Sequence, residues 1–317
     1  MTTKAPARTL KRQNYFQRLG RNIVSRKGIY LMLIPVFVYF IIFNYLPMYG
    51  AQIAFRDFRS TRQGITGAKW IGWKNFTDFF NGVYAGRLIR NTLLINFLNL
   101  IFGFPAPIIL ALLLNELRAD KFKKTVQTIS YLPHFISLVV ICGMIKDFVS
   151  TDGIITTALS AITGKNLANL LTAKENYRAI YVISDIWQGV GWGAIIYIAA
   201  LSGIDAEQYE AASMDGAGKF RQLLHVTLPG ILPTIIIMLI LRIGSMMSLG
   251  YEKTLLLYNE GIYETADIIS TYVYRAGLIG NQKGLASAVD LMNSAVNLIL
   301  LFTANGLSRK FSGSSLW

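Results

Sequence analysis

Residues that commonly carry catalysis or bind metals are scarce in this sequence. Among its 317 residues there are one cysteine and two histidines. Cys142 lies inside an apolar run and, as the single cysteine, cannot form an internal disulfide. His134 and His225 stand apart and belong to no His-Glu-x-x-His set, and no nucleophile is placed beside a base. An enzyme is therefore kept only as an alternative for this chain.

Charge is also scarce, and acidic side chains are especially few. Only 15% of the residues are charged, with 17 Asp and Glu against 31 Lys and Arg, and 53% are hydrophobic. One soluble domain cannot bury so much apolar surface, whereas runs of about 20 apolar residues can cross a bilayer. The basic residues lie between the apolar runs rather than on one patch, which favours membrane topology over nucleic-acid binding. We predict an integral membrane protein in contact with lipid and without a nucleic-acid partner.

Six long apolar segments stand out along the chain. Only helices and closed barrels satisfy their backbone groups in lipid, and continuous apolarity without strict alternation indicates helices. The predicted fold is all-α, with six transmembrane helices in a domain of residues 28–307. Pro105, Pro107 and Pro133 should bend the second and third spans. The segments are 28–46, 92–114, 126–145, 179–201, 231–249 and 286–307.

The basic residues also predict the orientation in the membrane. No small-residue cleavage site follows the first apolar run, so we expect a retained span rather than a signal peptide. With the N-terminus inside, the short cytoplasmic pieces hold 16 Lys and Arg, and the longer outer pieces hold 13. The higher density of basic residues in the short pieces predicts that both terminal segments, 1–27 and 308–317, lie in the cytoplasm. Apolar and basic residues alternate at near-helical spacing over residues 10–27, which predicts an interfacial helix, with a disordered tail as the alternative.

The predicted outer loop at residues 47–91 is long and aromatic. Trp70 and Trp73 are among its rings, which suggests either an interfacial aromatic belt or a small cap on the extracytoplasmic side. Residues 47–90 carry seven basic side chains against Asp57 and Asp78. This excess hints at an acidic solute by electrostatic attraction.

A polar insert rich in small residues, 205–229, separates the fourth and fifth apolar segments. Asp205 is a suitable N-cap with a capping-box partner three residues later, so a helix over residues 206–214 is predicted. Gly216 and Gly218 then favour a turn, after which a second helix runs into the fifth span.

The first helix of the insert suits recognition by a groove on another protein. Ala211 and Ala212 allow close approach, Tyr209 and Met214 offer apolar anchors, and Glu210 adds charge. An ordinary solvated loop helix is the alternative. The predicted docking residues are Tyr209, Glu210, Ala211, Ala212, Met214, Asp215 and Gly216.

Two glycine patterns resemble nucleotide motifs but fail the test. Gly218-Lys219 does not belong to a phosphate-loop motif, because Ser213 stands where the motif requires glycine and Phe220 where it requires serine or threonine. The second pattern lies inside an apolar span with no preceding strand, so we assign Gly189-x-x-x-Gly193 to close helix packing. We therefore expect no nucleotide, cofactor or metal site in this chain.

The insert also carries a recognisable signature. Glu210-Ala211-Ala212, three residues, Gly216, nine residues and Val226-x-Leu228-Pro229 resemble the signature of permease subunits of binding-protein-dependent ABC importers, with Val226 where isoleucine is usual. The resemblance extends along the chain. Among the further matches, the last two in chain order resemble in particular the carbohydrate importers that handle oligosaccharides derived from polysaccharides. These further matches are Asn91-Thr92-Leu93, Tyr131-Leu132-Pro133-His134, Asp185-Ile186-Trp187-Gln188, the stretch from Ala266 to Arg275, and Leu316-Trp317.

This resemblance implies half of a type I importer in a bacterial cytoplasmic (inner) membrane. It implies a second permease subunit, ATPase subunits that bind ATP and Mg and grip the cytoplasmic coupling helix between spans four and five, and an extracytoplasmic binding protein that delivers an oligosaccharide. Glu210, Ala211, Ala212 and Gly216 carry over as coupling residues. An ion-driven secondary transporter would be self-sufficient and often has inverted repeats, which are not evident here. It remains an alternative, together with a membrane-embedded enzyme.

Polar side chains within the last three spans are candidates for the solute pathway. Ionisable groups in a membrane usually face a partner or a cavity, so Asp185, Arg242 and Asp290 are expected to form one layer. They either form a structural ion pair or offer Arg242 or an aspartate to sugar hydroxyls or a uronate carboxylate. Aromatic rings with polar edges suit sugars as well. The predicted pathway residues are Asp185, Trp187, Gln188, Trp192, Arg242 and Asp290.

Overall fold

The computed structural model describes residues 25–59 and 64–317, and the regular secondary structure of this part of the chain is helical apart from one isolated bridge. The chain divides into two compact units, Met1–Gln52 and Ile53–Trp317. The all-α prediction is therefore confirmed. The predicted interfacial helix at residues 10–27 lies almost entirely outside the described residues.

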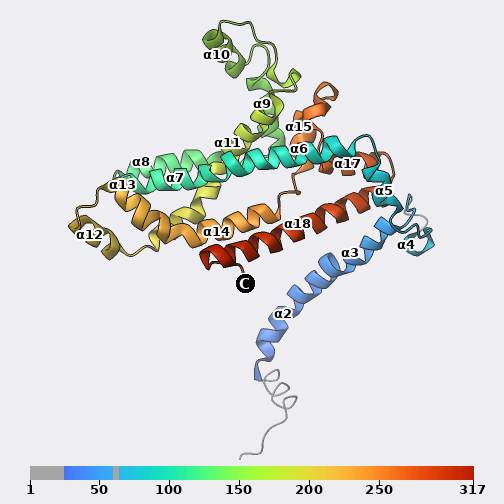
Figure 1. The fold of residues 1–317 in the computed structure, drawn as a ribbon, viewed down its shortest axis with the longest axis horizontal. Coiled ribbons are helices and arrows are strands. Elements are labelled where there is room, and N and C mark those ends of the chain that lie inside the picture. Colours follow the sequence, from blue (N-terminus) through green and yellow to red (C-terminus); the bar gives the residue numbers. More distant parts are fainter. Residues whose placement is uncertain (1–24, 60–63) are drawn as a thin grey trace, which may run out of the picture. The chain divides into compact units, whose positions relative to one another are not determined.

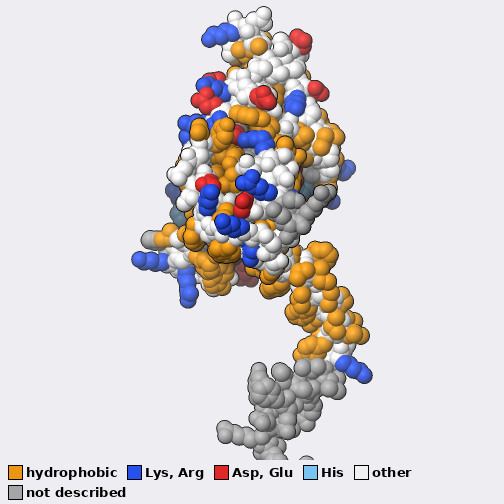
Figure 2. Space-filling model, turned by 90° about the vertical axis from the view of Figure 1, so that its right-hand side faces the viewer, with side chains coloured by type: hydrophobic (Ala, Val, Ile, Leu, Met, Phe, Trp, Pro, Cys, Tyr) orange, Lys and Arg blue, Asp and Glu red, His pale blue; other side chains and the backbone are white. Residues whose placement is uncertain are grey.

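Residues 27–55, most of which belong to the first unit, form one candidate membrane span. Helix α2 (Lys27–Phe40) continues through a π-helical turn, η1 (Ile41–Tyr45), into α3 (Leu46–Met48) and then into η2 (Tyr49–Phe55). Every side chain from residue 27 to residue 48 is exposed, and hydrophobic side chains cover this helix (Figure 2). A helix that is apolar all round is suited to lipid or to another membrane subunit.

The second unit contains the remaining apolar helices (Figure 1). Its long elements are α6 (Ala85–Leu98) with η4 (Asn99–Gly103) and α7 (Pro105–Glu116), α8 (Asp120–Tyr131) with η5 (Leu132–Phe135), α9 (Leu138–Phe148), α11 (Tyr177–Ser202), α14 (Leu228–Gly244) and α18 (Lys283–Ser312). Shorter elements are α4 (Gly64–Gly67), α5 (Lys74–Phe80), α10 (Ile154–Thr163), η6 (Leu170–Thr172), α12 (Ala206–Met214), α13 (Lys219–Gln222), η7 (Leu223–Thr227), α15 (Tyr251–Leu257), η8 (Glu260–Ile262), α16 (Tyr263–Ala266), α17 (Ile269–Tyr274) and η9 (Arg275–Ile279). The described chain has five helices long and apolar enough to span a membrane, or six when one bent pair is counted as a span.

That bent pair corrects the third predicted span. The segment 126–145 is not one continuous helix, because α8 with η5 and α9 meet at 103°. Pro133 disfavours helix in the residue before it and cannot donate its own backbone hydrogen bond. Ser137 then caps α9 by accepting from the amide of Val140 at 3.5 Å. The bend expected in this span is thus a break at residues 136–137, shortly after Pro133, which itself lies within η5.

Close approaches between helices explain part of the glycine pattern in α11. A Cβ on Gly191 would overlap the backbone carbonyl of Ser130 in α8, and one on Gly193 would lie 3.0 Å from the side chain of Pro107 in α7. Gly189 has nothing within 4 Å of such an atom. The packing role predicted for Gly193 is confirmed, whereas that for Gly189 is wrong, and Gly191 makes the closest contact.

Three buried clusters hold the second unit together. The largest joins α9, α11, α15 and the segment around α16, and includes Ile141, Tyr177, Leu257 and Ile262. A second joins α5, α6, α17 and α18, and the third joins α7, α11 and α14. Helix α14 lies beside α18, while α12 and α13 lie at the opposite end of the unit from α5 and α17 (Figure 1).

The described part of the predicted outer loop folds into a small cap. Arg56 and Trp70 form the antiparallel bridge, and Phe55 stacks on Trp70 with ring centroids 5.5 Å apart. Asn75 donates to the carbonyls of Ala54 and Arg56 at 2.8 and 3.1 Å. These bonds fit a cap better than a loose aromatic belt.

Candidate functional site

Helix α12 is defined at both ends by local backbone chemistry. The Asp205 carboxylate accepts from the amide of Glu207 at 3.0 Å and so caps the helix. At the other end Gly216 has a φ of +77°, a conformation that L side chains rarely adopt. The amides of Gly216 and Ala217 bond back to Ser213 and Ala212 at 3.0 and 2.9 Å, which is a Schellman motif. The observed helix, Ala206–Met214, has the predicted bounds.

Side-chain hydrogen bonds tie α12 to the helix that follows it. Tyr209 Oη and Thr227 Oγ1 are 3.1 Å apart. The buried amide of Gln222 donates to Ser213 Oγ at 2.9 Å and to the carbonyl of Ala217 at 3.0 Å. Because residues 219–244 form one continuous candidate span, a displacement of α12 would be transmitted to α14. Tyr209 is half-buried and bonded here, rather than being a freely exposed anchor.

The other predicted docking residues form the outward surface of this segment. Glu210, Ala211, Asp215 and Gly216 are exposed, and Ala212 is half-buried. Met214 is 89% exposed, so its apolar side chain is free to contact a partner protein. The helix therefore offers a small apolar surface flanked by carboxylates.

Three adjoining cavities lie among α6, α11, α14, α15, α17 and α18. The first has a volume of about 850 Å³ and includes Asp290 and the stacked pair Tyr251 and Tyr274. The second, of about 260 Å³, shares residues 248–250 with the first. The third, of about 340 Å³, shares Asp185, Arg242 and Ser245 with the second. Together they make a row of cavities beside the end of α14.

The backbone between α14 and α15 is irregular where it lines this row, and side chains of α17 and α18 bond to it. Asn297 Oδ1 accepts from the amide of Met247 at 2.8 Å, and Asn293 Nδ2 donates to the Met247 carbonyl at 2.7 Å. Ser270 Oγ donates to the carbonyl of Leu249 at 2.6 Å. Non-helical backbone within a membrane protein is tolerated where protein groups or a cavity satisfy it.

Two of the ionisable residues of the predicted layer, Asp185 and Arg242, line one cavity, and the third, Asp290, lines another. Asp185 pairs with Lys253 at 3.2 Å, and that ammonium also donates to the carbonyl of Tyr181 and lies 4.5 Å from the centre of its ring. Burial lowers the pKa of Lys253, and the Asp185 carboxylate opposes that shift. The structural ion pair thus joins Asp185 to a lysine that sequence reasoning had placed in an outer loop.

Residues 82–313 match the family described as the binding-protein-dependent transport system inner membrane component. The chain belongs to this family. The permease is 45% identical over 292 residues to protein LplB of Bacillus subtilis (strain 168), with 92% of this chain and 91% of the relative covered. It is 42% identical over 301 residues to the polygalacturonan/rhamnogalacturonan transport system permease protein YteP of the same strain, covering 95% and 94%.

Solved structures give the same assignment. The permease matches a chain of a bacterial alginate ABC transporter, crystallised with an alginate pentasaccharide-bound periplasmic protein, at a TM-score of 0.86 and 40% identity. The match covers 94% of this chain and 100% of that chain. The expected type I importer fold is therefore confirmed, and the chain is a multi-pass transport subunit of an ABC importer rather than an enzyme or an ion-driven transporter.

The two tryptophans predicted for the pathway lie elsewhere on α11. Trp187 lines a separate, largely apolar cavity of about 420 Å³ formed with α9 and α10. Trp192 stacks on His134 with ring centroids 4.5 Å apart and an interplanar angle of 5°. Neither belongs to the residues that line the three adjoining cavities.

Several residues of the cavity row were missed by sequence reasoning. Lys253, Asn96 and Asn99 line the second cavity. Gln188 is the one amide among the predicted pathway residues, and it lines this cavity as well. The asparagines at positions 91, 96 and 99 of an otherwise apolar segment are the sequence signal that could have identified this wall of the cavity.

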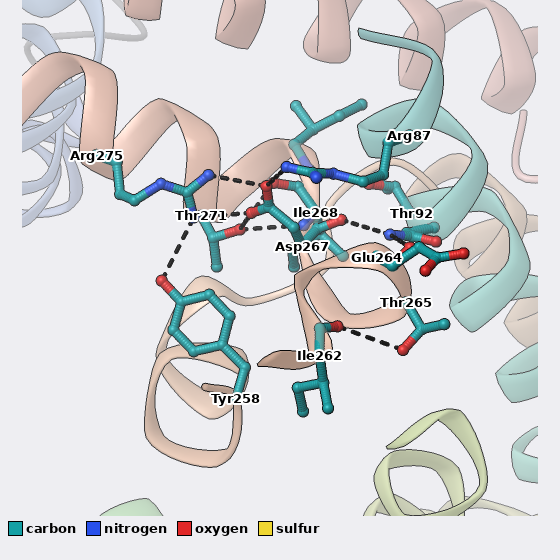
Figure 3. Close-up of polar contacts among 12 residues, drawn as sticks. Arg87, Thr92, Tyr258, Ile262, Glu264, Thr265, Asp267, Ile268, Thr271 and Arg275 are labelled. Carbon is teal, nitrogen blue, oxygen red and sulfur yellow. Dashed lines mark hydrogen bonds and ion pairs between the residues drawn. The ribbon is translucent and has the colours of Figure 1, made fainter. Parts of the chain in front are cut away.

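Two sequence motifs of the resemblance contact each other in the permease (Figure 3). Asn91 Nδ2 donates to the carbonyls of Glu264 and Asp267, both at 2.9 Å. Thr92 Oγ1 accepts from the amide of Ile269 at 3.0 Å. The start of the second span therefore holds the segment that leads from α16 into α17.

The same segment is fixed by a buried carboxylate. Asp267 is fully buried and accepts from Arg275 through two bonds of 2.8 Å and from Arg87 at 3.0 Å (Figure 3). Thr271 Oγ1 donates to it at 2.9 Å. The bond to Asp267 raises the pKa of Arg275, so this guanidinium stays charged. The cluster joins α6 to α17.

Proposed function

We propose that the permease forms half of the transmembrane path of an ATP-driven importer and that α12 is its coupling helix. The observation that supports this is the structure of α12, which is capped at both ends and exposes the apolar side chain of Met214. Hydrogen bonds of Tyr209 and Gln222 connect this helix to the start of a membrane span. ATP and Mg would bind to partner ATPase subunits, and a second permease would complete the path.

In this proposal, closure of the ATPase dimer moves α12 as a rigid element. The Tyr209–Thr227 and Gln222–Ser213 contacts carry the displacement into α14, whose far end holds Arg242 and the irregular segment 245–250. Because these groups line the cavity row, a shift of α14 would change which side of the membrane the cavities face. Such rigid-body switching between two states is a common form of coupling.

We propose an oligosaccharide containing uronate units as the solute, delivered by an extracytoplasmic binding protein. The names of the relatives support this, since one is a polygalacturonan/rhamnogalacturonan permease and another imports the acidic polysaccharide alginate. The cavity row, with Asp185, Gln188, Arg242 and Asp290 in its walls, would be the route. Both termini would lie in the cytoplasm of a bacterium, with the spans in its cytoplasmic membrane.

The first test is purification of the tagged permease from its native membrane and identification of the proteins recovered with it. An ATPase and a second permease are expected, and their complex should take up oligogalacturonate only with ATP and the binding protein. Recovery of the permease alone, with uptake insensitive to ATP, would contradict the proposal.

A glycine substitution then tests the coupling helix. Gly216→Val forces a β-branched residue to a φ of +77°, at a cost of about 1–2 kcal/mol, and should unwind the end of α12. We expect uptake to fall at least tenfold relative to ATP hydrolysis. Gly218→Ala is the control, because Gly218 has an ordinary φ of −67° and nothing within 4 Å of an added Cβ. If both variants couple ATP hydrolysis to uptake as well as the wild type does, α12 is not the coupling helix.

A further inference from the structure

The second cavity contains polar side chains for which the described part of the permease provides no partner. Asn99 is 1% exposed, and neither its amide nitrogen nor its amide oxygen is hydrogen-bonded. Gln188 and Arg242 line the same cavity, and no hydrogen bond or ion pair of their side chains lies within the described residues. A buried amide without a partner is less favourable than an apolar side chain of the same shape, so its presence calls for a ligand or a second conformation.

The local backbone supports a functional origin for this arrangement. Asn99 opens η4, the π-helical turn between α6 and α7, and π-bulges occur frequently at functional sites. Segment 245–250, the irregular backbone after α14, forms another part of the same wall. A π-helical turn within one membrane helix and the irregular backbone at the end of another therefore meet at one small cavity, and irregular helices line the solute sites of other transporters.

The charges in the cavity point to an anionic ligand group. Asp185 is already paired with Lys253. The remaining carboxylate in the wall, Glu252, is exposed and forms no ion pair with Arg242 within 4.0 Å. Arg242 is thus a cation in a predicted span with no acid bonded to it in the described structure. A guanidinium fits a carboxylate through two parallel hydrogen bonds, and charge-assisted bonds of this kind are strong.

We propose that this cavity binds one uronate unit of the transported oligosaccharide. Arg242 pairs with the sugar carboxylate, and the amides of Asn99 and Gln188 bond to ring hydroxyls. The Asp185–Lys253 pair fixes the wall and does not contact the sugar. The volume of about 260 Å³ is below the range of roughly 300–1,000 Å³ found for drug-sized ligands, which suits a single ring. This inference rests on the proposed import of an acidic oligosaccharide.

The test measures binding of D-galacturonate and D-galactose to the purified importer complex without its binding protein, by saturation-transfer NMR. The wild-type complex should bind galacturonate at least tenfold more tightly than galactose. Asn99→Leu removes no protein hydrogen bond, so the complex should assemble normally, while its galacturonate affinity falls about tenfold, the effect of a single lost hydrogen bond. Arg242→Gln should abolish the preference for the acid.

Thr156→Val provides the matched control. Thr156 is fully buried, its hydroxyl is also unpartnered, and it lies on α10 outside the cavity. This variant should bind galacturonate like the wild type. Unchanged affinity in Asn99→Leu, equal affinity for the two sugars, or no binding by the wild type would overturn the inference.

Uptake separates this inference from the proposed function. At saturating loaded binding protein, Asn99→Leu should take up trigalacturonate at least tenfold more slowly than Thr156→Val. ATP-dependent uptake by wild type that is unaffected by Asn99→Leu would refute the binding site alone. A complex that binds galacturonate but shows no ATP-dependent uptake would refute the proposed function instead.

Discussion

Single residues decide where this permease is rigid. Asp267 is the clearest case, because one fully buried carboxylate binds two arginines from different elements. Both guanidinium groups also face aromatic rings, Arg87 over Tyr84 and Arg275 over Tyr263, each at 5.1 Å. Such a cluster is most costly to break when only one partner is removed, since the remaining charges are left uncompensated.

Asp267→Asn should therefore destabilise the permease by about 3–5 kcal/mol, the usual cost of removing one partner of a buried ion pair. The measurement is the thermal unfolding midpoint of the detergent-solubilised complex. Glu264→Gln is the control, because its ion pair with Lys174 is exposed, with side-chain exposures of 58% and 44%. That variant should leave the midpoint unchanged. Equal midpoints for both variants would contradict a stabilising role for the cluster.

At the scale of elements, contacts between helices depend on small residues at particular positions. Helix α11 contacts α7, α8 and α14, and its glycines let neighbouring helices approach closely. The Gly191 contact is with backbone atoms of α8, which cannot rotate away as a side chain can.

Gly191→Ala should force α11 and α8 apart, at a cost of about 1–3 kcal/mol or more from overpacking. We expect a smaller yield of monodisperse permease in size-exclusion chromatography of a fluorescently tagged chain. Gly189→Ala, two residues away, meets nothing within 4 Å and should behave like the wild type. Indistinguishable profiles for the two variants would show that the contact is not needed.

For the molecule as a whole, the distribution of basic residues predicts its orientation in the membrane. Lys and Arg are denser in the segments that join the predicted cytoplasmic ends of the spans, and the exposed α12 lies among those segments. The proposed coupling requires α12 to face the cytoplasm, where ATP is available. The opposite orientation would therefore also contradict the proposed coupling.

Cysteine labelling in intact spheroplasts tests this orientation. Cys142 is 1% exposed and is first replaced by alanine. In that background, Thr151→Cys should react with a membrane-impermeant maleimide, because the segment after α9 is predicted to lie outside. Arg118→Cys, between α7 and α8, should react only after permeabilisation. Both side chains are exposed, so accessibility reports the side of the membrane. The reverse labelling pattern would contradict the orientation.

The sequence alone determined the features that depend on local chemistry. Apolar runs, the Asp205 cap and the glycine at a positive φ act within a few residues, so the helical class and the bounds of α12 could be predicted. The Glu210-Ala211-Ala212 signature identified the family for the same reason, since its spacing is read along the chain.

Tertiary structure alone decided which distant side chains meet. Lys253 pairs with Asp185 across 68 positions, and Arg87 reaches Asp267 across 180. The break of 103° between α8 and α9 and the separation of Asp290 from Arg242 also follow from packing. In a membrane helix each side chain faces lipid, a neighbouring helix or a cavity according to the helix's rotation. That rotation is set by contacts such as Gly191 against Ser130, which no local pattern encodes.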